Sequence, residues 1–463
     1  MSDFTVSLSG AHFRNKSRSI GMKLIVICGL ALLMVVPSFF VAGLVEDRTK
    51  READVIKEIS AHVGGQQTFL GPTLAIPYII PPESATAVPT RGMYLISPAK
   101  ASAVIKIATQ ERRRSLFKVP VFQADSRFDA SFDLTGVPNA APHGAQFDWN
   151  RAELIVGVSD PRGALADATL IMGGKTYNLV PAEIAQNISF GGDQNSRLKL
   201  TLFGAKVQIQ HIAKTDPQFD VATSLRFSGA QRIAVLAYGK TTHLSVQGDW
   251  PSPGFDGGFL PVSRTISPKG FTAEWSVPSI ARGVRSEGQS ETITGLDSTA
   301  LGVSFIEVAD PYQSVNRSLK YILLFLGLVF LSYFIFEVTT GKRVHLAQYI
   351  LVGIAQIIFY LLLLSLAERI GFDWGFLVGG AATVVLLSTN AGWIFGSWMQ
   401  GTRALAIFSL LYGMIYLMLR LEDNSLLVGA IASFLAVAAA MYFTRKIDWY
   451  SSLPQPSVAE KSI

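Results

Sequence analysis

The chain has 463 residues and 49% of them are apolar, which excludes a purely water-soluble enzyme. Its single cysteine, Cys28, excludes a disulfide framework, and we expect it to pack as a small apolar side chain. The formal net charge is +6, but the basic residues gather beside apolar runs, so this charge indicates membrane topology and not nucleic-acid binding.

Six apolar stretches have the length of about 17–25 residues that a helix needs to cross a bilayer. One stands near the N-terminus, and the other five crowd the last third of the chain. The predicted spans are 22–45, 321–338, 347–367, 375–395, 404–420 and 425–443. We therefore predict a membrane protein that combines α and β structure, with six transmembrane helices and a large external domain between the first and the second.

The basic residues predict the orientation of these spans. They precede the first span, follow the second, separate the fourth from the fifth and follow the sixth: Arg14, Lys16, Arg18, Lys23, Lys342, Arg343, Arg403, Arg445 and Lys446. The positive-inside rule then places residues 1–21 and 444–463 in the cytoplasm and residues 46–320 outside it. The first span is longer than the 7–15 apolar residues of a signal peptide, which favours an uncleaved anchor.

The segment 46–66 predicts a stalk helix that continues out of the membrane. Glu46 and Lys50 are spaced for an ion pair, and Val55, Ile59 and Val63 share one helix face. The glycines at 64 and 65 should end the helix. Two interpretations stay open, a solvated helix without a partner and a docking surface.

From residue 67 to about 320, short runs alternate apolar and polar residues. His243 to Gln247 and Lys206 to Gln210 are examples, and Gly, Pro, Asn and Asp separate such runs. Many short strands with these turns predict a β-sandwich or a related all-β fold. We expect the prolines of this segment, Pro72 among them, at strand ends and edges, because proline cannot donate to a sheet.

A search for catalytic, cofactor and metal motifs gives no enzyme. The Gly173-Gly174-Lys175-Thr176 run lacks the first glycine of a phosphate loop, so we interpret it as a turn. The histidines have no metal-ligand spacing: His12, His62, His143, His211, His243 and His345. Asp125, Asp129 and Asp133 fit the solvated face of a strand. Arg112 to Arg114 form a basic run that suits an exposed loop or, as the alternative, anionic lipid head groups.

Few polar residues fall within the spans. Glu337 and Arg420 lie near span ends, where we expect them to reach the interface. Gln356 and Asn390 are candidates for hydrogen bonds between helices. Polar positions in a membrane often mark function, so these four residues are candidate sites.

Several ordered motifs resemble the bacterial CreD family of inner-membrane cell envelope integrity proteins. The resemblance covers the chain from the first span to Tyr450. The motifs that carry it are Gly71-Pro72-Thr73-Leu74-Ala75-Ile76-Pro77-Tyr78, Phe117 to Ala124, Gly248 to Gly257 with Leu260-Pro261, Val308 to Val315, Glu422-Asp423 and Thr444 to Tyr450. The resemblance implies a bacterial inner-membrane location with residues 46–320 in the periplasm. It also implies a link to envelope integrity, tolerance to a colicin and the response to cell-wall antibiotics.

The loop Gly248 to Gly257 has two interpretations, fold architecture and partner binding. Its candidate partner-binding residues are Trp250, Pro251, Phe255 and Asp256. The first functional hypothesis is a non-enzymatic protein that binds an envelope protein or cell-wall component through the external domain. The alternative is a transporter, channel or lipid-handling protein with that domain as receptor or gate. Both need the lipid bilayer as a partner, and neither needs a cofactor or a nucleic acid.

Overall fold

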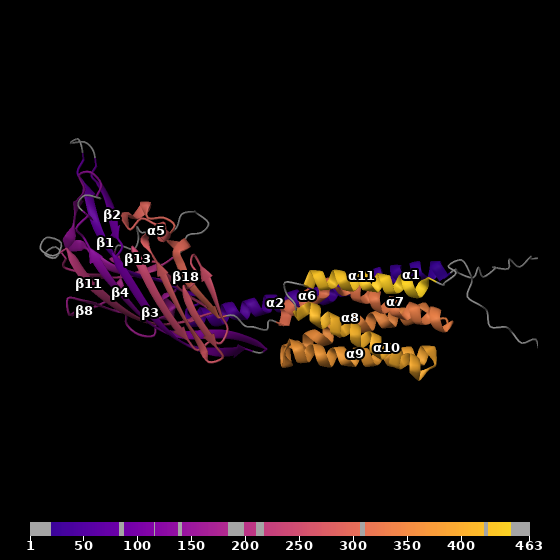
Figure 1. The fold of residues 1–463 in the computed structure, drawn as a ribbon. Helices are drawn as coiled ribbons and strands as arrows, with labels where there is room; N and C mark the ends of the chain where they lie inside the picture. The colour runs from indigo at the N-terminus through magenta and orange to yellow at the C-terminus, as the bar shows by residue number, and fades with distance from the viewer. Residues whose placement is uncertain are drawn as a thin grey trace, which may run out of the picture. The chain divides into compact units, whose positions relative to one another are not determined.

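A computed structural model describes residues 20–82, 88–114, 116–137, 141–183, 199–209, 217–305, 311–420 and 425–445. Most of the predicted N-terminal segment, the tail beyond Arg445, His12, His211 and the motif residues 308–310 and 422–423 lie outside this part of the chain. The chain divides into two compact units (Figure 1). The helical unit contains residues 1–50 and 309–463, and the β domain contains residues 51–308.

The described helices are α1 Ile20–Leu33, α2 Val35–Val63, α5 Ser279–Arg282, α6 Pro311–Lys320, α7 Ile322–Thr340, α8 Leu346–Ile370, α9 Phe372–Phe395, α10 Trp398–Arg420 and α11 Ser425–Thr444. Helices α7 to α10 are joined by short turns, so neighbours in sequence pack against one another. Gly341 ends α7 in the left-handed conformation at φ 68°, which glycine adopts without a Cβ clash.

Five described helices are long and apolar enough to span a membrane, one N-terminal and four C-terminal. They are Gly21–Val63, Ile322–Thr340, Leu346–Ile370, Phe372–Phe395 and Trp398–Arg420. The sixth predicted span, 425–443, is helical in α11, but the apolar stretch found there covers only Gly429–Ala439. The predicted fold class is confirmed with five membrane helices in place of six.

Buried aromatic rings fill the centre of the helical unit. The hydroxyl of Tyr333 on α7 donates to the carbonyl of Leu387 on α9 at 2.7 Å. Its ring stacks on Phe408 of α10, with ring centroids 5.7 Å apart. Because lipid is as apolar as these side chains, such close packing and internal hydrogen bonding hold membrane helices together.

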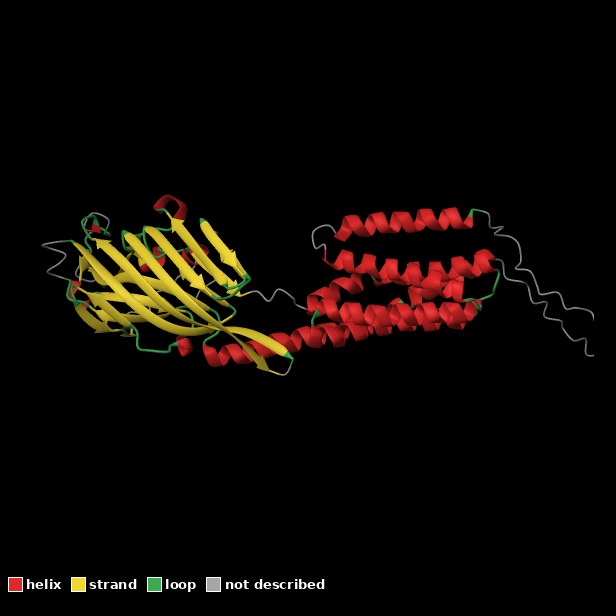
Figure 2. Cartoon of the chain, turned by 60° about the horizontal axis from the view of Figure 1, so that its bottom comes forward, coloured by secondary structure: helices red, strands yellow, loops and turns green. Residues whose placement is uncertain are grey.

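The β domain consists of two sheets (Figure 2). The described strands are β1 Gln67–Ile80, β2 Thr90–Ile96, β3 Lys100–Arg114, β4 Phe117–Asp133, β5 Gln146–Phe147, β6 Glu153–Val158, β7 Thr169–Met172, β8 Lys175–Asn178, β9 Val180–Pro181, β10 Thr201–Lys206, β11 Gln218–Ala230, β12 Arg232–Leu236, β13 Thr241–Gly248, β14 Pro253–Gly257, β15 Ser263–Ser267, β16 Gly270–Val277, β17 Glu287–Gln289 and β18 Ala300–Phe305.

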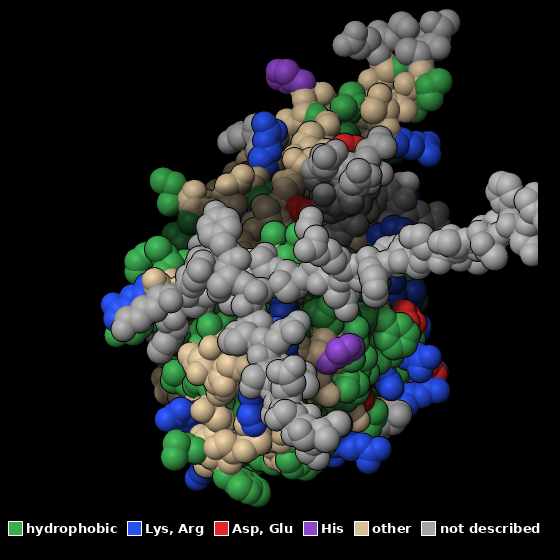
Figure 3. Space-filling view, turned by 90° about the vertical axis from the view of Figure 1, so that its right-hand side faces the viewer, with side chains coloured by type: hydrophobic (Ala, Val, Ile, Leu, Met, Phe, Trp, Pro, Cys, Tyr) green, Lys and Arg blue, Asp and Glu red, His purple; other side chains and the backbone are tan. Residues whose placement is uncertain are grey.

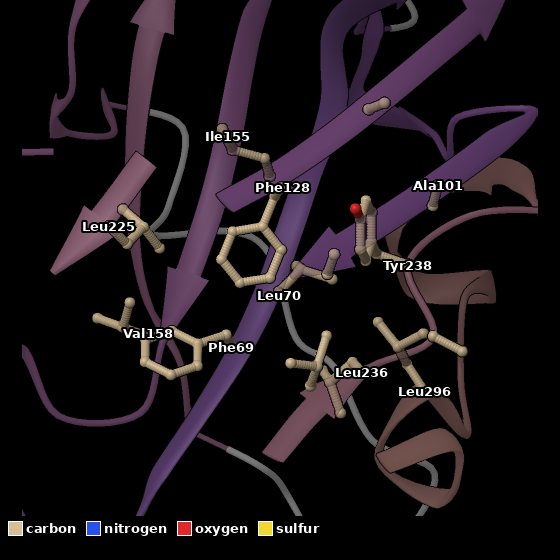
Figure 4. Close-up of a cluster of buried hydrophobic side chains, with 14 of the residues drawn as sticks. Phe69, Leu70, Ala101, Phe128, Ile155, Val158, Leu225, Leu236, Tyr238 and Leu296 are labelled. Carbon is tan, nitrogen blue, oxygen red and sulfur yellow. The ribbon is translucent and has the colours of Figure 1, made fainter. Parts of the chain in front are cut away.

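The first sheet has the order β14-β18-β12-β1-β6-β10-β9, with β2, β5 and β17 beside it, and the second has the order β15-β16-β13-β3-β4-β11-β7-β8. Their inner faces share one apolar core. Phe69 of β1 contacts Phe128 of β4 across the two sheets, with ring centroids 6.1 Å apart (Figure 4). Strand β3 alternates exposed and buried residues along most of its length, as the sequence pattern predicts.

Pro72 lies inside the central strand β1, and not at a strand end or edge as expected. The register between β1 and β6 shifts between Leu70 and Thr73, so a bulge accommodates the missing N–H of proline. Beside it, Gly71 meets the ring of the buried Tyr238. A Cβ built on Gly71 would lie 2.6 Å from atoms of that ring.

The C-terminal half of α2 is a docking helix. Its apolar residues Val55, Ile56, Ile59 and Val63 pack on Val119, Val121 and Ala230 of the second sheet. Glu58 on the same helix pairs with Arg114. The helix ends before Gly64 and Gly65, as predicted. Of the two open interpretations of this segment, the structure supports docking.

We expect Gly71→Ala to lower the free energy of unfolding of the β domain by about 1–3 kcal/mol, because the added methyl group overpacks the ring of Tyr238. The measurement is thermal unfolding of the full-length protein in detergent, followed by tryptophan fluorescence. Gly136→Ala is the matched control, since a Cβ at Gly136 meets no atom within 4 Å. Equal melting temperatures for the two variants would contradict this packing.

Candidate functional site

The predicted partner-binding loop is held by contacts within the β domain. It connects β13 to β14. The backbone N–H and the hydroxyl of Thr109 donate to the carboxylate of Asp249 at 2.8 and 2.6 Å. The ring of Trp250 meets Phe305 edge to face at 6.1 Å. Pro251 is exposed at the turn.

Asp256 and Phe255 fix the strand β14 that follows. The Nε of Arg232 donates to Asp256 at 2.8 Å, and the hydroxyl of Ser304 donates to the same carboxylate. Burial alone would raise the pKa of the Asp256 carboxyl, but these bonds outweigh it and hold the pKa below its ordinary value. The ring of Phe255 meets Trp275 at 5.8 Å. These contacts give Trp250, Phe255 and Asp256 an architectural role.

An exposed apolar strip lies next to this loop, and the sequence patterns did not reveal it. Strand β15 is the outermost strand of the second sheet, and all five of its residues are exposed. Val262 is 75% exposed, Leu260 is 66% exposed and Ile266 is 49% exposed. We call residues 260–267 the β15 edge. The signal in the sequence was three apolar residues within seven positions beside a turn, but it did not distinguish an inward from an outward face.

Glu337 in α7 forms a buried polar cluster, so the expectation that it reaches the interface was wrong. Its side chain is 2% exposed and pairs with Lys23 of α1. It also accepts hydrogen bonds from the N–H of Val344 and the hydroxyl of Tyr349, each at 3.1 Å. Lys23 donates in turn to the carbonyl of Val344 at 2.6 Å. We call these four residues the Glu337 cluster. It joins α1, α7 and α8.

A second carboxylate, Glu368 of α8, links α2 to the helical bundle. Arg48 of α2 lies 3.6 Å from Glu368, and the hydroxyl of Tyr312 donates to the same carboxylate at 3.0 Å. The side chain of Glu368 is 7% exposed. The predicted third span ends at residue 367, so the sequence placed Glu368 in the loop that follows and did not mark it as a candidate site residue.

The other polar positions in the spans have different surroundings. Arg420 is exposed at the end of α10, where it pairs with Asp373 and lies over the ring of Tyr416, as a side chain at the interface should. The Nε2 atom of Gln356 and the Oδ1 atom of Asn390 are buried without a hydrogen-bond partner among the described residues. The predicted interhelical hydrogen bonds are therefore not found for these two atoms.

A groove runs along the seam of α9 and α10. Two hollows of about 500 and 590 Å³ share Val385 and Leu405. Glycines line both hollows, and the exposed Trp393 and Trp398 stand at one of them. We call this feature the α9–α10 groove. Its apolar lining and its place between membrane helices suit a hydrocarbon chain.

The motifs that the sequence search considered have ordinary structural roles where the structure describes them. Among the described residues, no three His, Cys, Asp or Glu side chains gather as a metal site. Asp125 pairs with Arg226 and Asp129 with Arg127, so this row is a solvated strand face. Gly173 and Gly174 form the turn between β7 and β8, as predicted.

These features define a multi-pass membrane protein that carries a large two-sheet domain between its first and second membrane helices. The family model described as "Inner membrane protein CreD" matches residues 19–450. The chain is 26% identical over 441 residues to the inner membrane protein CreD of Escherichia coli (strain K12), with 94% of each chain covered. The chain belongs to the CreD family, and the resemblance predicted from its motifs is confirmed. It is an inner-membrane protein of the cell envelope.

We expect Lys23→Met to lower the free energy of unfolding by on the order of 3 kcal/mol, because it leaves a buried carboxylate without its cation. The double variant Lys23→Met/Glu337→Leu should recover most of this loss, since it removes both charges. A double-mutant cycle on the full-length protein in detergent, read by melting temperature, measures the coupling.

The exposed pair Arg420–Asp373 is the matched control for this cycle. Its side chains are 56% and 47% exposed. We expect its coupling to be below about 1 kcal/mol, because water screens it. A coupling as small at Lys23–Glu337 would show that the Glu337 cluster does not hold the helices together.

Proposed function

We propose that this chain is a non-enzymatic envelope-integrity protein. Its β domain lies outside the cytoplasm and binds a protein or wall component of the envelope, and its helices anchor the domain. This role includes the link to envelope stress and cell-wall antibiotics that the motifs imply. The β15 edge is the observation that carries the proposal. It is an exposed apolar surface on the β domain, whose described strands include no membrane span, so contact with the hydrocarbon core does not account for it.

The chemistry of the β15 edge fits an extended segment of a partner. An outermost strand has one row of backbone N–H and C=O groups that no neighbouring strand pairs, and proteins usually cover or charge such strands. Here Val262 and Ile266 stay exposed, and Arg264 lies over the ring of Phe255. A partner strand would add backbone hydrogen bonds and cover these side chains.

Residues of the predicted loop hold the strands next to the β15 edge in place. The Arg232–Asp256 pair and the Ser304 bond fix β14, the outermost strand of the first sheet. Phe255 on β14 packs against Trp275 on β16, the neighbour of β15. The loop residues thereby position the edge on which recognition would occur.

The distribution of charge supports the proposed orientation. Figure 3 views the molecule from the end of the helical unit where α7 and α9 terminate, and Lys and Arg side chains (blue) surround this face. Lys342 and Arg343 belong to the connection between α7 and α8 at this end, and Arg403 lies in the second turn of α10. Lys23 contacts Val344 there, so the start of α1 and the end of α7 share one side. The positive-inside rule assigns that side to the cytoplasm.

A second candidate function, lipid handling, is favoured by the α9–α10 groove alone. An acyl chain would lie against its glycine-lined wall and cover Val385 and Leu405. This function would need the groove to stay open. The two candidates therefore predict different responses to substitutions in the groove and at the edge.

In a strain that lacks this gene, we expect Val262→Lys/Ile266→Lys to fail to restore resistance to detergent and β-lactam. The charges would block the strand edge against a partner, as edge lysines do in other sheets. Complementation with the full-length chain, with protein level checked by immunoblot, is the measurement. Ile171→Lys is the matched control, since Ile171 is 45% exposed on β7, away from the β15 edge.

Gly413→Leu distinguishes the lipid-handling alternative. Gly413 lines one hollow of the groove, and a Cβ there meets no atom within 4 Å, so a leucine side chain at this position would occupy the groove. Partner recognition at the edge predicts normal rescue by this variant, and lipid handling predicts loss of rescue. Full rescue by the edge variant together with loss by Gly413→Leu would reverse the order of the two functions.

Single cysteines test the orientation. In a Cys28→Ser background, Lys269→Cys in the β15–β16 turn should react with a membrane-impermeant maleimide on intact cells whose outer membrane has been permeabilised. Ser397→Cys, between α9 and α10, should react only after the inner membrane is opened, because the positive-inside rule places it in the cytoplasm. The reverse pattern would contradict the proposed location of the β domain.

A further inference from the structure

The hairpin of β3 and β4 extends beyond the sheet that contains it. The neighbour β13 pairs with β3 only as far as Ile107, and β11 pairs with β4 only as far as Val121. The two hairpin strands continue to pair with each other up to Arg114 and Phe117. We call residues 109–114 and 116–120 the basic arm.

The arm carries four basic side chains and one acidic side chain. Arg113 and Lys118 lie 3.5 and 3.9 Å from Glu111, at side-chain exposures of 40% or more. Arg112 is exposed and makes no ion pair with a described residue. Leu116 adds an apolar side chain at the tip, 40% exposed. The arm thus presents an excess of positive charge with an apolar tip.

Successive residues of a strand point to opposite faces, so the basic side chains are spread over both faces of the arm. Arg112 and Arg114 share one face, and Arg113 lies on the other. A pocket for one small anion would gather its cations on one side. This spread suits a continuous anionic surface instead.

The arm runs along α2 toward the membrane-spanning part of that helix. At its base, the N–H of Ala230, which pairs with Val121, donates to the carbonyl of Gly65 just beyond α2. Toward its tip, Arg114 pairs with Glu58, which lies earlier on the helix. Figure 2 shows the hairpin (yellow) beside this part of α2.

The helix that the arm follows is also the helix of the first predicted span. Helix α2 is continuous from Val35 to Val63, so Glu58, the partner of Arg114, stands 13 residues after Val45, the end of that span. The arm therefore packs on the segment of chain that leaves the membrane.

We infer that the basic arm binds anionic phospholipid head groups at the surface of the membrane that α1 and α2 enter. Arg112, Arg113 and Lys118 supply the charge, and Leu116 supplies an apolar contact at the interface. Polybasic segments beside a membrane span are attracted to anionic lipid in this way. The arm lies apart from the β15 edge, so this binding is independent of the proposed partner recognition.

The test uses the full-length chain with Cys28→Ser and Leu116→Cys, labelled with an environment-sensitive fluorophore. The protein is placed in nanodiscs of phosphatidylcholine alone or of phosphatidylcholine mixed with phosphatidylglycerol. We expect a blue shift of the emission and a roughly twofold fall in iodide quenching in the anionic discs, both reversed by high salt because salt screens the attraction.

Arg112→Gln/Arg113→Gln should abolish this lipid dependence while leaving the melting temperature unchanged, since both side chains are exposed. Lys106→Gln/Lys175→Gln removes the same charge outside the arm and should leave the shift intact. A label at Ile171→Cys should respond to neither lipid. An arm label that stays equally quenched in both kinds of disc would overturn the proposal and leave an acidic protein as the partner of the arm.

Discussion

The hydrocarbon core of a bilayer offers no hydrogen-bonding partner, and this constraint determines how the helical unit is held together. A charge inside the unit must find its counter-charge in the protein. Lys23 and Glu337 do so between α1 and α7, and Arg48 and Glu368 do so between α2 and α8. The N-terminal helix is thereby fixed at two levels to helices that follow it by some 300 residues in sequence.

The β domain also pairs buried polar side chains, here with neutral partners. The hydroxyl of Tyr238 lies within hydrogen-bonding distance of the carbonyls of Ser102 and Asp129 at 2.9 and 3.0 Å. Buried Arg282 donates to the carbonyl of Ala237 at 2.7 Å and to the hydroxyl of Ser97 at 3.2 Å. Burial lowers the pKa of the Arg282 guanidinium to about 10, so it stays charged at neutral pH and keeps these bonds. Tyr238 thus joins the two sheets by polar bonds as well as by apolar contact, and Arg282 ties together the ends of β12 and β2 in the first sheet.

The surfaces that the protein leaves uncovered differ in chemistry from one unit to the other. The β15 edge is apolar with open backbone groups, which suits a polypeptide. The basic arm is cationic and follows α2, which suits a charged surface. The α9–α10 groove is apolar and lies between membrane helices, which suits an acyl chain. An envelope protein with these three surfaces would contact lipid through two of them and keep the third for a partner.

The sequence by itself determined five of the six predicted membrane helices, the position of the β domain between the first and the second, the helix stop at Gly64-Gly65, the turn at Gly173-Gly174 and the family. These depend on length, periodicity and local turn chemistry, which act over a few residues. Only the tertiary structure decided that Glu337 is buried against Lys23, that Asp256 holds β14, and that Val262 and Ile266 face outward. Each of these depends on which distant strand or helix lies opposite, and an alternating pattern is the same whether its apolar face meets a core or remains open.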